Sequence, residues 1–217
     1  MICFKLSRIT FLIITRKRNM RKTIALIGGG FKPFTKGHYM LVSQAAAESD
    51  EVNLIVSTTN RQRPGQLPVF WDTQMKKIWD GYLEKAMPNN VHVSYVSNPT
   101  TAMWDILKDA NDDPNNHNTY VIYGGEDDIP RYFAEKYLTK HAPRLVENGQ
   151  LETKTPERIA SGTNLRKNVV DGDVAEFSKG LPGPVQRYAQ EIFDILALSI
   201  NQITDKVSTK KRKPRKK

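Results

Sequence analysis

The segment from Gly28 to His38, which reads GGGFKPFTKGH, brings glycines, a threonine and a histidine together. Glycines let a backbone approach a phosphate or a base without a Cβ in the way. Thr35 and His38 lie three residues apart where we expect a helix to begin, so both would point to one spot beside its first N–H groups. Those groups and the helix dipole favour phosphate. An imidazole there could stabilise charge that grows on an α-phosphoryl group or on leaving pyrophosphate.

A second candidate anion site lies far downstream, between Ile159 and Val169 (IASGTNLRKNV). Ser161 or Thr163 could cap the following helix and leave its first N–H groups pointing outward. Arg166 comes one helical turn after Thr163 and could reach the same anion. Its planar guanidinium suits bidentate recognition of phosphate. We therefore expect this segment to hold the β- and γ-phosphates of a triphosphate.

Each segment alone has a plainer interpretation. The glycines could simply end a strand, Thr35 could be only an N-cap, and Arg166 could be an exposed arginine on a capped helix. Two common phosphate-binding patterns are absent, because there is no G-x-x-x-x-G-K-S/T and Gly28-x-Gly30 lacks a third glycine at the required distance. The sequence therefore argues against a P-loop kinase and a dinucleotide dehydrogenase.

The two segments together resemble the nucleotidyltransferase superfamily, whose cytidylyltransferase-like members carry a T/H-x-G-H motif. The pattern G-x-F-x-P-x-(H/T)-x-G-H is matched by Gly29 or Gly30, Phe31, Pro33, Thr35, Gly37 and His38. The pattern I-S-(S/G)-T-x-(I/L/M)-R is matched by Ile159, Ser161, Gly162, Thr163, Leu165 and Arg166, with Ala160 as an extra residue. The stretch from Asp171 to Pro182 also resembles nucleotidyltransferases of large bacteriophages, so the resemblance covers roughly residues 23–182.

The resemblance implies transfer of AMP or CMP from a nucleoside triphosphate to a small phosphorylated acceptor, with release of pyrophosphate. Catalytic roles would fall to His38, Arg166 and Thr35. The implied nucleotide-binding residues are Gly28, Gly29, Gly30, Phe31, Gly37, Gly124, Asp127, Ser161 and Thr163. We expect ATP rather than CTP, by a narrow margin. The acceptor stays open among nicotinamide mononucleotide, phosphopantetheine, flavin mononucleotide and a polyol phosphate.

Three further basic residues are candidates for binding the acceptor. Arg61 and Arg63 follow the second expected strand, on the edge where ligands of open α/β sheets bind, although loop arginines are often simply solvated. Lys32 stands where many family members carry Asp or Gln, which leaves the substrate class open. We expect all three to face the acceptor.

An acidic turn, Gly124–Asp128, follows the fourth expected strand and resembles the family's G-x-D element, with Asp127 as the preferred match and Glu126 as the second. Either carboxylate could help to position Mg²⁺, which prefers carboxylate and phosphate oxygens. A solvated turn is the alternative. We expect Mg²⁺ to be held mainly by the triphosphate, with no certain protein ligand, and the histidine spacing predicts no zinc site.

Alternating apolar and amphipathic segments must position these residues. The expected strands are 23–28, 52–57, 91–96, 120–123 and one within 145–155, and the expected helices are 37–49, 69–87, 100–110, 129–139, 161–170, 173–179 and 184–207. Repeated strand–helix units imply parallel pairing through right-handed crossovers. We therefore predict a three-layer, doubly wound (Rossmann-like) α/β domain with about five parallel strands and C-terminal helices.

The net charge of +10 is concentrated at the two ends of the chain. Residues 1–22 and 208–217 each carry seven Lys or Arg and no acid, which leaves 19 basic and 23 acidic residues between them. We predict a basic extension over residues 1–22, a nucleotidyltransferase domain over 23–207 and a disordered basic tail over 208–217. Residues 1–19 could lie upstream of a natural start at Met20, or form an organelle presequence.

The basic ends suggest an alternative function, that of a nucleic-acid-associated protein that uses a nucleotide-binding scaffold. Because 208–217 lacks aromatic residues for base stacking, we expect at most weak nucleic-acid contact through this tail. No apolar run approaches the length of a membrane span, and Cys3 alone cannot form an internal disulfide. We expect a cytoplasmic protein, in the host cytoplasm if it is viral, with no membrane contact; the oligomeric state cannot be inferred.

Overall fold

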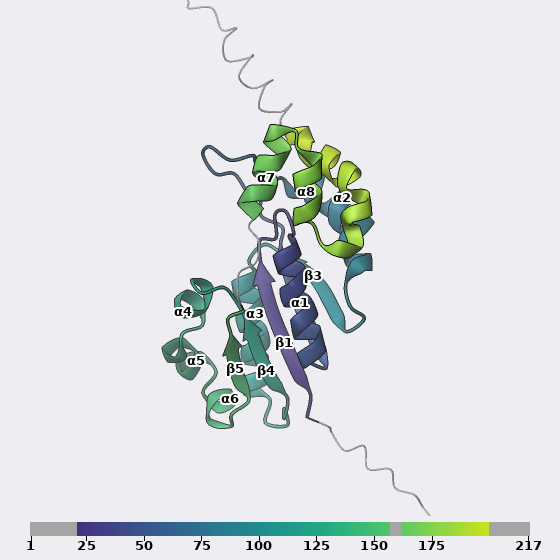
Figure 1. Ribbon diagram of the computed structural model, residues 1–217. Helices are drawn as coiled ribbons and strands as arrows, with labels where there is room; N and C mark the ends of the chain where they lie inside the picture. Colours follow the sequence, from purple (N-terminus) through teal and green to yellow (C-terminus); the bar gives the residue numbers. More distant parts are fainter. Residues whose placement is uncertain (1–20, 157–161, 200–217) are drawn as a thin grey trace, which may run out of the picture.

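The computed structural model describes residues 21–156 and 162–199, and its centre is a parallel sheet (Figure 1). Its strands are β1 (Thr23–Gly29), β2 (Glu51–Ser57), β3 (Val91–Val96), β4 (Thr119–Tyr123) and β5 (Leu151–Lys154). They lie in the order β3-β2-β1-β4-β5, and every neighbouring pair is parallel. The chain therefore runs outward from β1 in one direction and then in the other, which confirms the predicted doubly wound topology. The order changes direction between β1 and β4, so ligands are expected beside their C-terminal ends.

The central strand β1 is apolar because both of its faces are covered. Ala25 and Ile27 belong to one buried cluster, whereas Ile24 and Leu26 belong to the other. Side chains of a strand alternate between the two faces of a sheet. A run without polar residues is thus what a strand buried on both sides requires.

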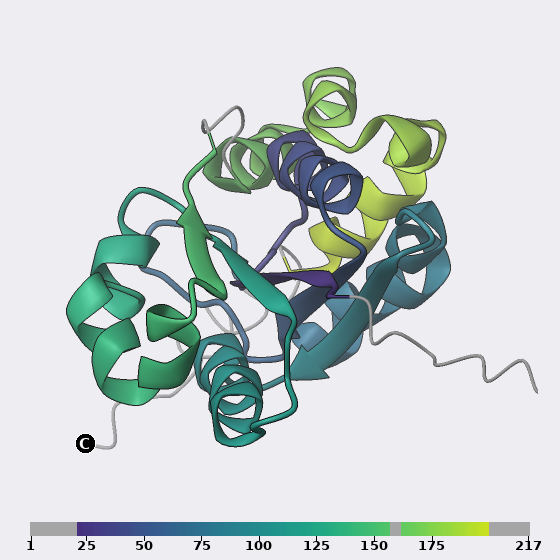
Figure 2. The same cartoon turned by 90° about the horizontal axis from the view of Figure 1, so that it is seen from below.

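Helices cover both faces of the sheet, as Figure 2 shows from below. Helix α1 (Lys36–Glu48) packs on one face through Val42 and Ala45, together with the helical segment 71–86 and the C-terminal helices. Helix α3 (Pro99–Asp112) packs on the opposite face through Met103 and Leu107. These layers confirm the predicted three-layer architecture.

The predicted helix 69–87 is present but is shorter and less regular than expected. It is built from η1 (Trp71–Met75), α2 (Lys76–Ile78), η2 (Trp79–Leu83) and η3 (Glu84–Ala86), of which η1 and η2 are π-helical and η3 is a 3₁₀ turn. Trp71, Met75, Trp79 and Leu83 recur every four residues and are all buried. That interval exceeds the 3.6 residues of an α turn, and widened turns keep all four side chains directed at the core.

One further predicted helix is divided in the structure, and the predicted fifth strand is present. The single helix expected over 129–139 is two helices, α4 (Asp128–Tyr132) and α5 (Glu135–His141), because Phe133 between them turns into the core. The strand expected within 145–155 is confirmed as β5, which begins at Leu151 after a further helix, α6 (Pro143–Glu147).

The C-terminal part lies beyond the C-terminal ends of the strands. Its elements are α7 (Gly162–Asp171), α8 (Val174–Gly180), the 3₁₀ helix η4 (Gly183–Tyr188) and a helix over residues 189–199. Figure 1 shows α7 and α8 above the end of β1. The helix predicted over 184–207 thus starts as a 3₁₀ turn, and its last part, like the tail 208–217 and residues 1–20 of the predicted extension, lies outside the described residues. None of the described helices has the length and apolar character needed to cross a membrane.

Candidate functional site

Helix α1 begins at the cap that Thr35 forms with His38. The backbone N–H of His38 donates to Thr35 Oγ1 at 3.3 Å, and the backbone N–H of Thr35 donates to His38 Nδ1 at 3.0 Å. This is a capping box with His in place of the usual Glu or Gln. Because Nδ1 accepts that hydrogen bond, the neutral ring carries its proton on Nε2. Thr35 is completely buried and belongs to neither of the cavities described below, so the structure places it behind His38 as the residue that orients the ring.

The three glycines before this cap have different surroundings. A Cβ on Gly28 would lie 2.5 Å from Met103 Sδ, and one on Gly29 would lie 2.8 Å from the ring of Phe31, whose own φ is +46°. These two glycines therefore make room for side chains of the protein itself. A Cβ on Gly30 would meet nothing within 4 Å, and all three glycines line the second cavity described below.

Helix α7 presents Arg166 to the same region. Its side chain is almost fully buried, with 3% of the residue exposed. The guanidinium donates to the carbonyl of Lys32 at 2.7 Å, to Thr163 Oγ1 at 2.9 Å and to Gln66 Oε1 at 3.0 Å. The first of these bonds ties the two sequence motifs together directly. Ser161, predicted to bind the nucleotide with Thr163, lies outside the described residues.

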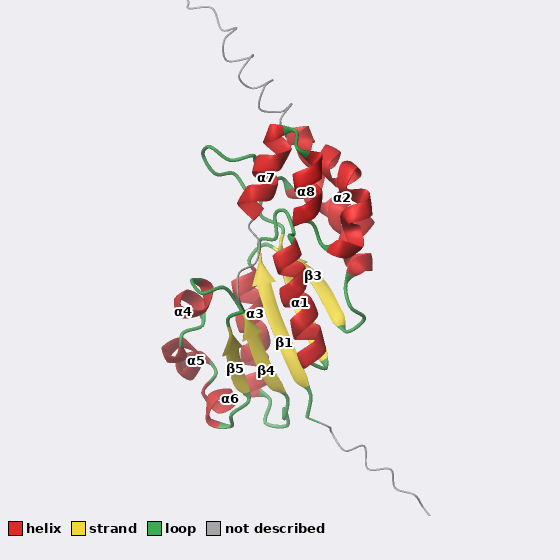
Figure 3. Ribbon diagram, in the orientation of Figure 1, coloured by secondary structure: helices red, strands yellow, loops and turns green. Residues whose placement is uncertain are grey.

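The loop between β2 and the helical segment 71–86 supplies two more arginines, Arg61 and Arg63. Figure 3 shows that this long loop extends as far as α7. Backbone hydrogen bonds of 2.9 Å in both directions between Arg61 and Val69 close its base. Arg61 is half-buried and donates to Gln66 Oε1 at 3.3 Å. The sequence placed Arg61 and Arg63 at this edge but gave no indication of Gln66, whose contacts depend on residues 5 and 100 positions away.

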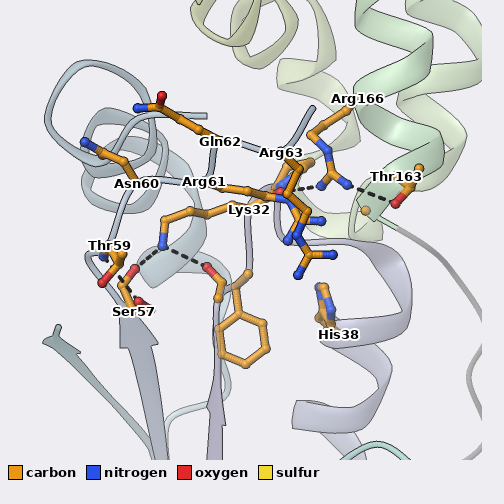
Figure 4. A pocket seen from close by; sticks show the side chains of 14 residues that line it. Lys32, His38, Ser57, Thr59, Asn60, Arg61, Gln62, Arg63, Thr163 and Arg166 are labelled. Atoms are coloured by element: carbon orange, nitrogen blue, oxygen red, sulfur yellow. Dashed lines mark hydrogen bonds between the residues drawn. The ribbon is translucent and has the colours of Figure 1, made fainter. Parts of the chain in front are cut away.

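These elements enclose a cavity of about 440 Å³. Its charged wall consists of Lys32, Arg61, Arg63 and Arg166, with His38 at its edge, and no Asp or Glu of the described chain lines it. Figure 4 shows the three guanidiniums gathered above the His38 ring. Burial, and then the charges of Arg61 and Arg63, lower the pKa of Arg166 to about 10. Because no carboxylate of the described residues on this wall offsets these charges, the cavity is suited to an anion such as phosphate.

Lys32 occupies an unexpected position in this cavity. Only 6% of the residue is exposed, and its ammonium group donates to the carbonyl of Gly30 at 3.1 Å and to the carbonyl of Ser57. Burial, and then the charge of Arg61, lower its pKa to about 8. Lys32 therefore joins the ends of β1 and β2, so its ammonium is less available to an acceptor than we predicted.

A second cavity, of about 350 Å³, adjoins the first. It follows the ends of β1 and β4 and is lined by glycines and by the acidic turn, including Gly37, Gly124, Glu126 and Asp127. The two cavities share Gly30, Phe31, His38 and Gly162. A ligand with a neutral part and an anionic part could thus span both, with His38 at the junction.

Comparisons with known proteins support this architecture at the level of fold. No model of a protein family matches the sequence, and no curated protein matches it. Two similar solved structures are a bifunctional NMN adenylyltransferase/ADP-ribose pyrophosphatase of Francisella tularensis, complexed with AMP and a manganese ion, and the nicotinic acid mononucleotide adenylyltransferase of Plasmodium falciparum, complexed with NaAD. The chain has the fold of these adenylyltransferases.

The likeness is structural, with little identity in sequence. The Francisella structure gives a TM-score of 0.51 at 17% identity over 91% of this chain, which spans 58% of the length of that protein. The Plasmodium structure gives 0.50 at 16% identity over 81% of this chain and 98% of that one. Function must therefore be inferred from the site itself.

Proposed function

We propose that the chain is a nucleotidyltransferase that transfers a nucleoside monophosphate to a small phosphorylated acceptor and releases pyrophosphate. The observation that carries this proposal is the cavity in which Lys32, Arg61, Arg63 and Arg166 meet without a carboxylate, next to His38 at a helix N-terminus. A triphosphate supplies the missing negative charge. The nucleoside would occupy the second cavity, beside the glycines at the ends of β1 and β4.

The proposed reaction is a single in-line displacement. An oxygen of the acceptor phosphate attacks the α-phosphorus, the bond to the bridging oxygen breaks, and pyrophosphate leaves with the electron pair, without a covalent enzyme intermediate. His38 donates from Nε2 to the phosphates near the junction of the cavities, and Arg166 lies beside the departing β- and γ-phosphates. Such preorganised donors contribute chiefly by positioning the reactants and by stabilising charge in the transition state.

The nucleotide is expected to be ATP, as in the adenylyltransferases that share the fold. Arg61 and Arg63 are the proposed acceptor-binding residues, since both reach the cavity from the loop after β2. The acceptors considered from the sequence all remain candidates, and the Francisella and Plasmodium proteins put NMN and nicotinic acid mononucleotide first among those to be tested.

A divalent cation is expected to enter with the triphosphate. Among the described residues, no group of three or more His, Cys, Asp or Glu is arranged to hold a metal. Glu126 and Asp127 on the second cavity offer oxygens of the kind that Mg²⁺ prefers. We propose that one of them assists binding, with the phosphates as the main ligands; the ion would neutralise phosphate charge.

The proposal is tested by pyrophosphate release from ATP and from CTP in the presence of Mg²⁺, across a panel of phosphorylated acceptors. A parallel thermal-shift panel with ATP, CTP and the candidate products would reveal binding even where the acceptor is wrong. We expect stabilisation by a triphosphate and turnover with one acceptor. A chain that is stabilised by no triphosphate at millimolar concentration would contradict the proposal.

A further inference from the structure

Gln66 links two arginines that would otherwise repel each other. Its Oε1 accepts a hydrogen bond from Arg166 at 3.0 Å and another from Arg61 at 3.3 Å. The charge of Arg61 contributes to lowering the pKa of Arg166, so the two guanidiniums interact unfavourably when both are charged. An amide oxygen between them carries partial negative charge and offsets part of that repulsion.

Gln66 does not itself face the proposed ligand. The residues that line the 440 Å³ cavity include Arg61 and Arg166 but not Gln66. Its oxygen therefore holds both guanidiniums from outside the cavity. The Nε groups of Arg61 and Arg166 are buried and have no hydrogen-bond partner among the described residues.

The loop fixes the direction of the Gln66 side chain. The backbone N–H of Gln66 donates to the carbonyl of Arg63 at 3.1 Å and closes a turn in which Gly65 has a φ of +72°. That left-handed conformation suits glycine. The Arg61–Val69 bridge closes the base of the same loop. Gln66 thus projects from a turn anchored at both ends.

We infer that Gln66 is a positioning residue that fixes Arg61 and Arg166 in one orientation for binding a polyphosphate. This inference rests on the proposed function, because it assumes that the cavity binds phosphate groups. The sequence motifs that carry Arg166 do not include Gln66, and the role follows from its two hydrogen bonds. Without the amide oxygen, the two guanidiniums would separate and would have to be brought together again by the ligand.

The experiment measures binding of inorganic tripolyphosphate to the full chain by isothermal titration calorimetry. Gln66→Met keeps the length of the side chain and removes the acceptor. We expect about tenfold weaker binding, because the hydrogen bonds to two charged guanidiniums are lost and part of that loss is recovered when the anion binds. Gln190→Met is the matched control, because Gln190 is exposed and its side-chain amide donates to Asp194 on the same helix. The affinity of this variant for tripolyphosphate should stay within twofold of the wild type.

A double-mutant cycle separates positioning from a general effect on the loop. In an Arg61→Met background the hydrogen bond between Arg61 and Gln66 is already lost. The factor by which Gln66→Met weakens binding should therefore be at least threefold smaller in this background than in the wild type. Equal losses in the two backgrounds, or unchanged affinity of the single variant, would overturn the inference and leave the proposed function intact. Should Gln66→Met melt below the assay temperature, Gln66→Ser gives the same comparison. Failure of the wild type to bind tripolyphosphate would reject both proposals together.

Discussion

Replacing Lys32 by Met should change how stability depends on pH. The folded protein lowers the pKa of this lysine from 10.5 to about 8, because the ammonium is buried and lies near Arg61. Between these two values the unfolded chain binds more protons at Lys32 than the folded chain does. The free energy of unfolding therefore rises with pH in this window. Below about pH 8 both states are protonated, and the cost of burying the charge is present in full.

The size of the effect follows from the two pKa values. Between pH 7 and pH 9.5 the Lys32 contribution to the free energy of unfolding should increase by about 2 kcal/mol. Lys32→Met removes this slope, and the loss of the donor to the carbonyls of Gly30 and Ser57 shifts stability by an amount that does not vary with pH. The window ends below the titration of Tyr95 and Tyr123, whose pKa values the fold raises.

The assay is urea denaturation of wild type and variant at half-unit pH intervals in one buffer mixture at constant ionic strength. The quantity compared is the difference between the two free energies of unfolding as a function of pH, because slopes from other groups cancel in it. We expect that difference to grow by about 2 kcal/mol. A difference that is flat from pH 7 to pH 9.5 would refute the reasoning and would mean that Lys32 is accessible to water.

Three further predictions concern single side chains. His38→Gln keeps a side chain able to complete the capping box, so it should preserve the melting temperature while pyrophosphate release falls on the order of 10²–10³-fold; full activity would exclude the assigned role. Gly28→Ala should lower the free energy of unfolding by about 1–3 kcal/mol, because Met103 fills the space that the added Cβ would need. Gly30→Ala should leave stability unchanged and weaken ATP binding. Equal melting temperatures of the two variants would contradict this difference. Arg144→Met should cost about 2–3 kcal/mol in urea denaturation, because its guanidinium binds three carbonyls at the end of α3; a loss below about 0.5 kcal/mol would contradict this.

Much of the fold could be predicted from local patterns. Apolar segments that end in glycine or polar turns alternate with amphipathic helical segments along the chain. This pattern predicts parallel strands, and the prediction is confirmed. The order of the strands was not predicted, because pairing β1 with both β2 and β4 is decided by long-range packing. The widened turns of 71–86 escaped prediction for a related reason, since they depend on the fit of Trp71 and Trp79 against the core.

The site was predictable as far as its motifs extend. The motifs led us to expect that His38 and Arg166 lie near one cavity, and the structure places both residues beside the same cavity, although their roles remain predictions. The surroundings of the glycines and of Lys32 could not be predicted, because they depend on contacts that form only in the folded chain. Gly28 and Gly29 make room for Met103 and Phe31, and both also line the second cavity. The Lys32 ammonium binds backbone carbonyls, because Gly30 after β1 and Ser57 at the end of β2 place those oxygens within reach.

The charge distribution favours a ligand site over a solvated basic loop. Outside its two basic ends the chain has more acidic than basic residues, 23 against 19, yet no carboxylate of the described chain lines the cavity that holds Lys32, Arg61, Arg63 and Arg166. Arginines that were only solvated would keep their ordinary pKa values, whereas burial and mutual repulsion lower the pKa values of Lys32, Arg61 and Arg166. The folded chain thus bears a cost that an anion would relieve. A site arranged in this way is more stable with its ligand than without it, which is the thermodynamic condition for binding a triphosphate.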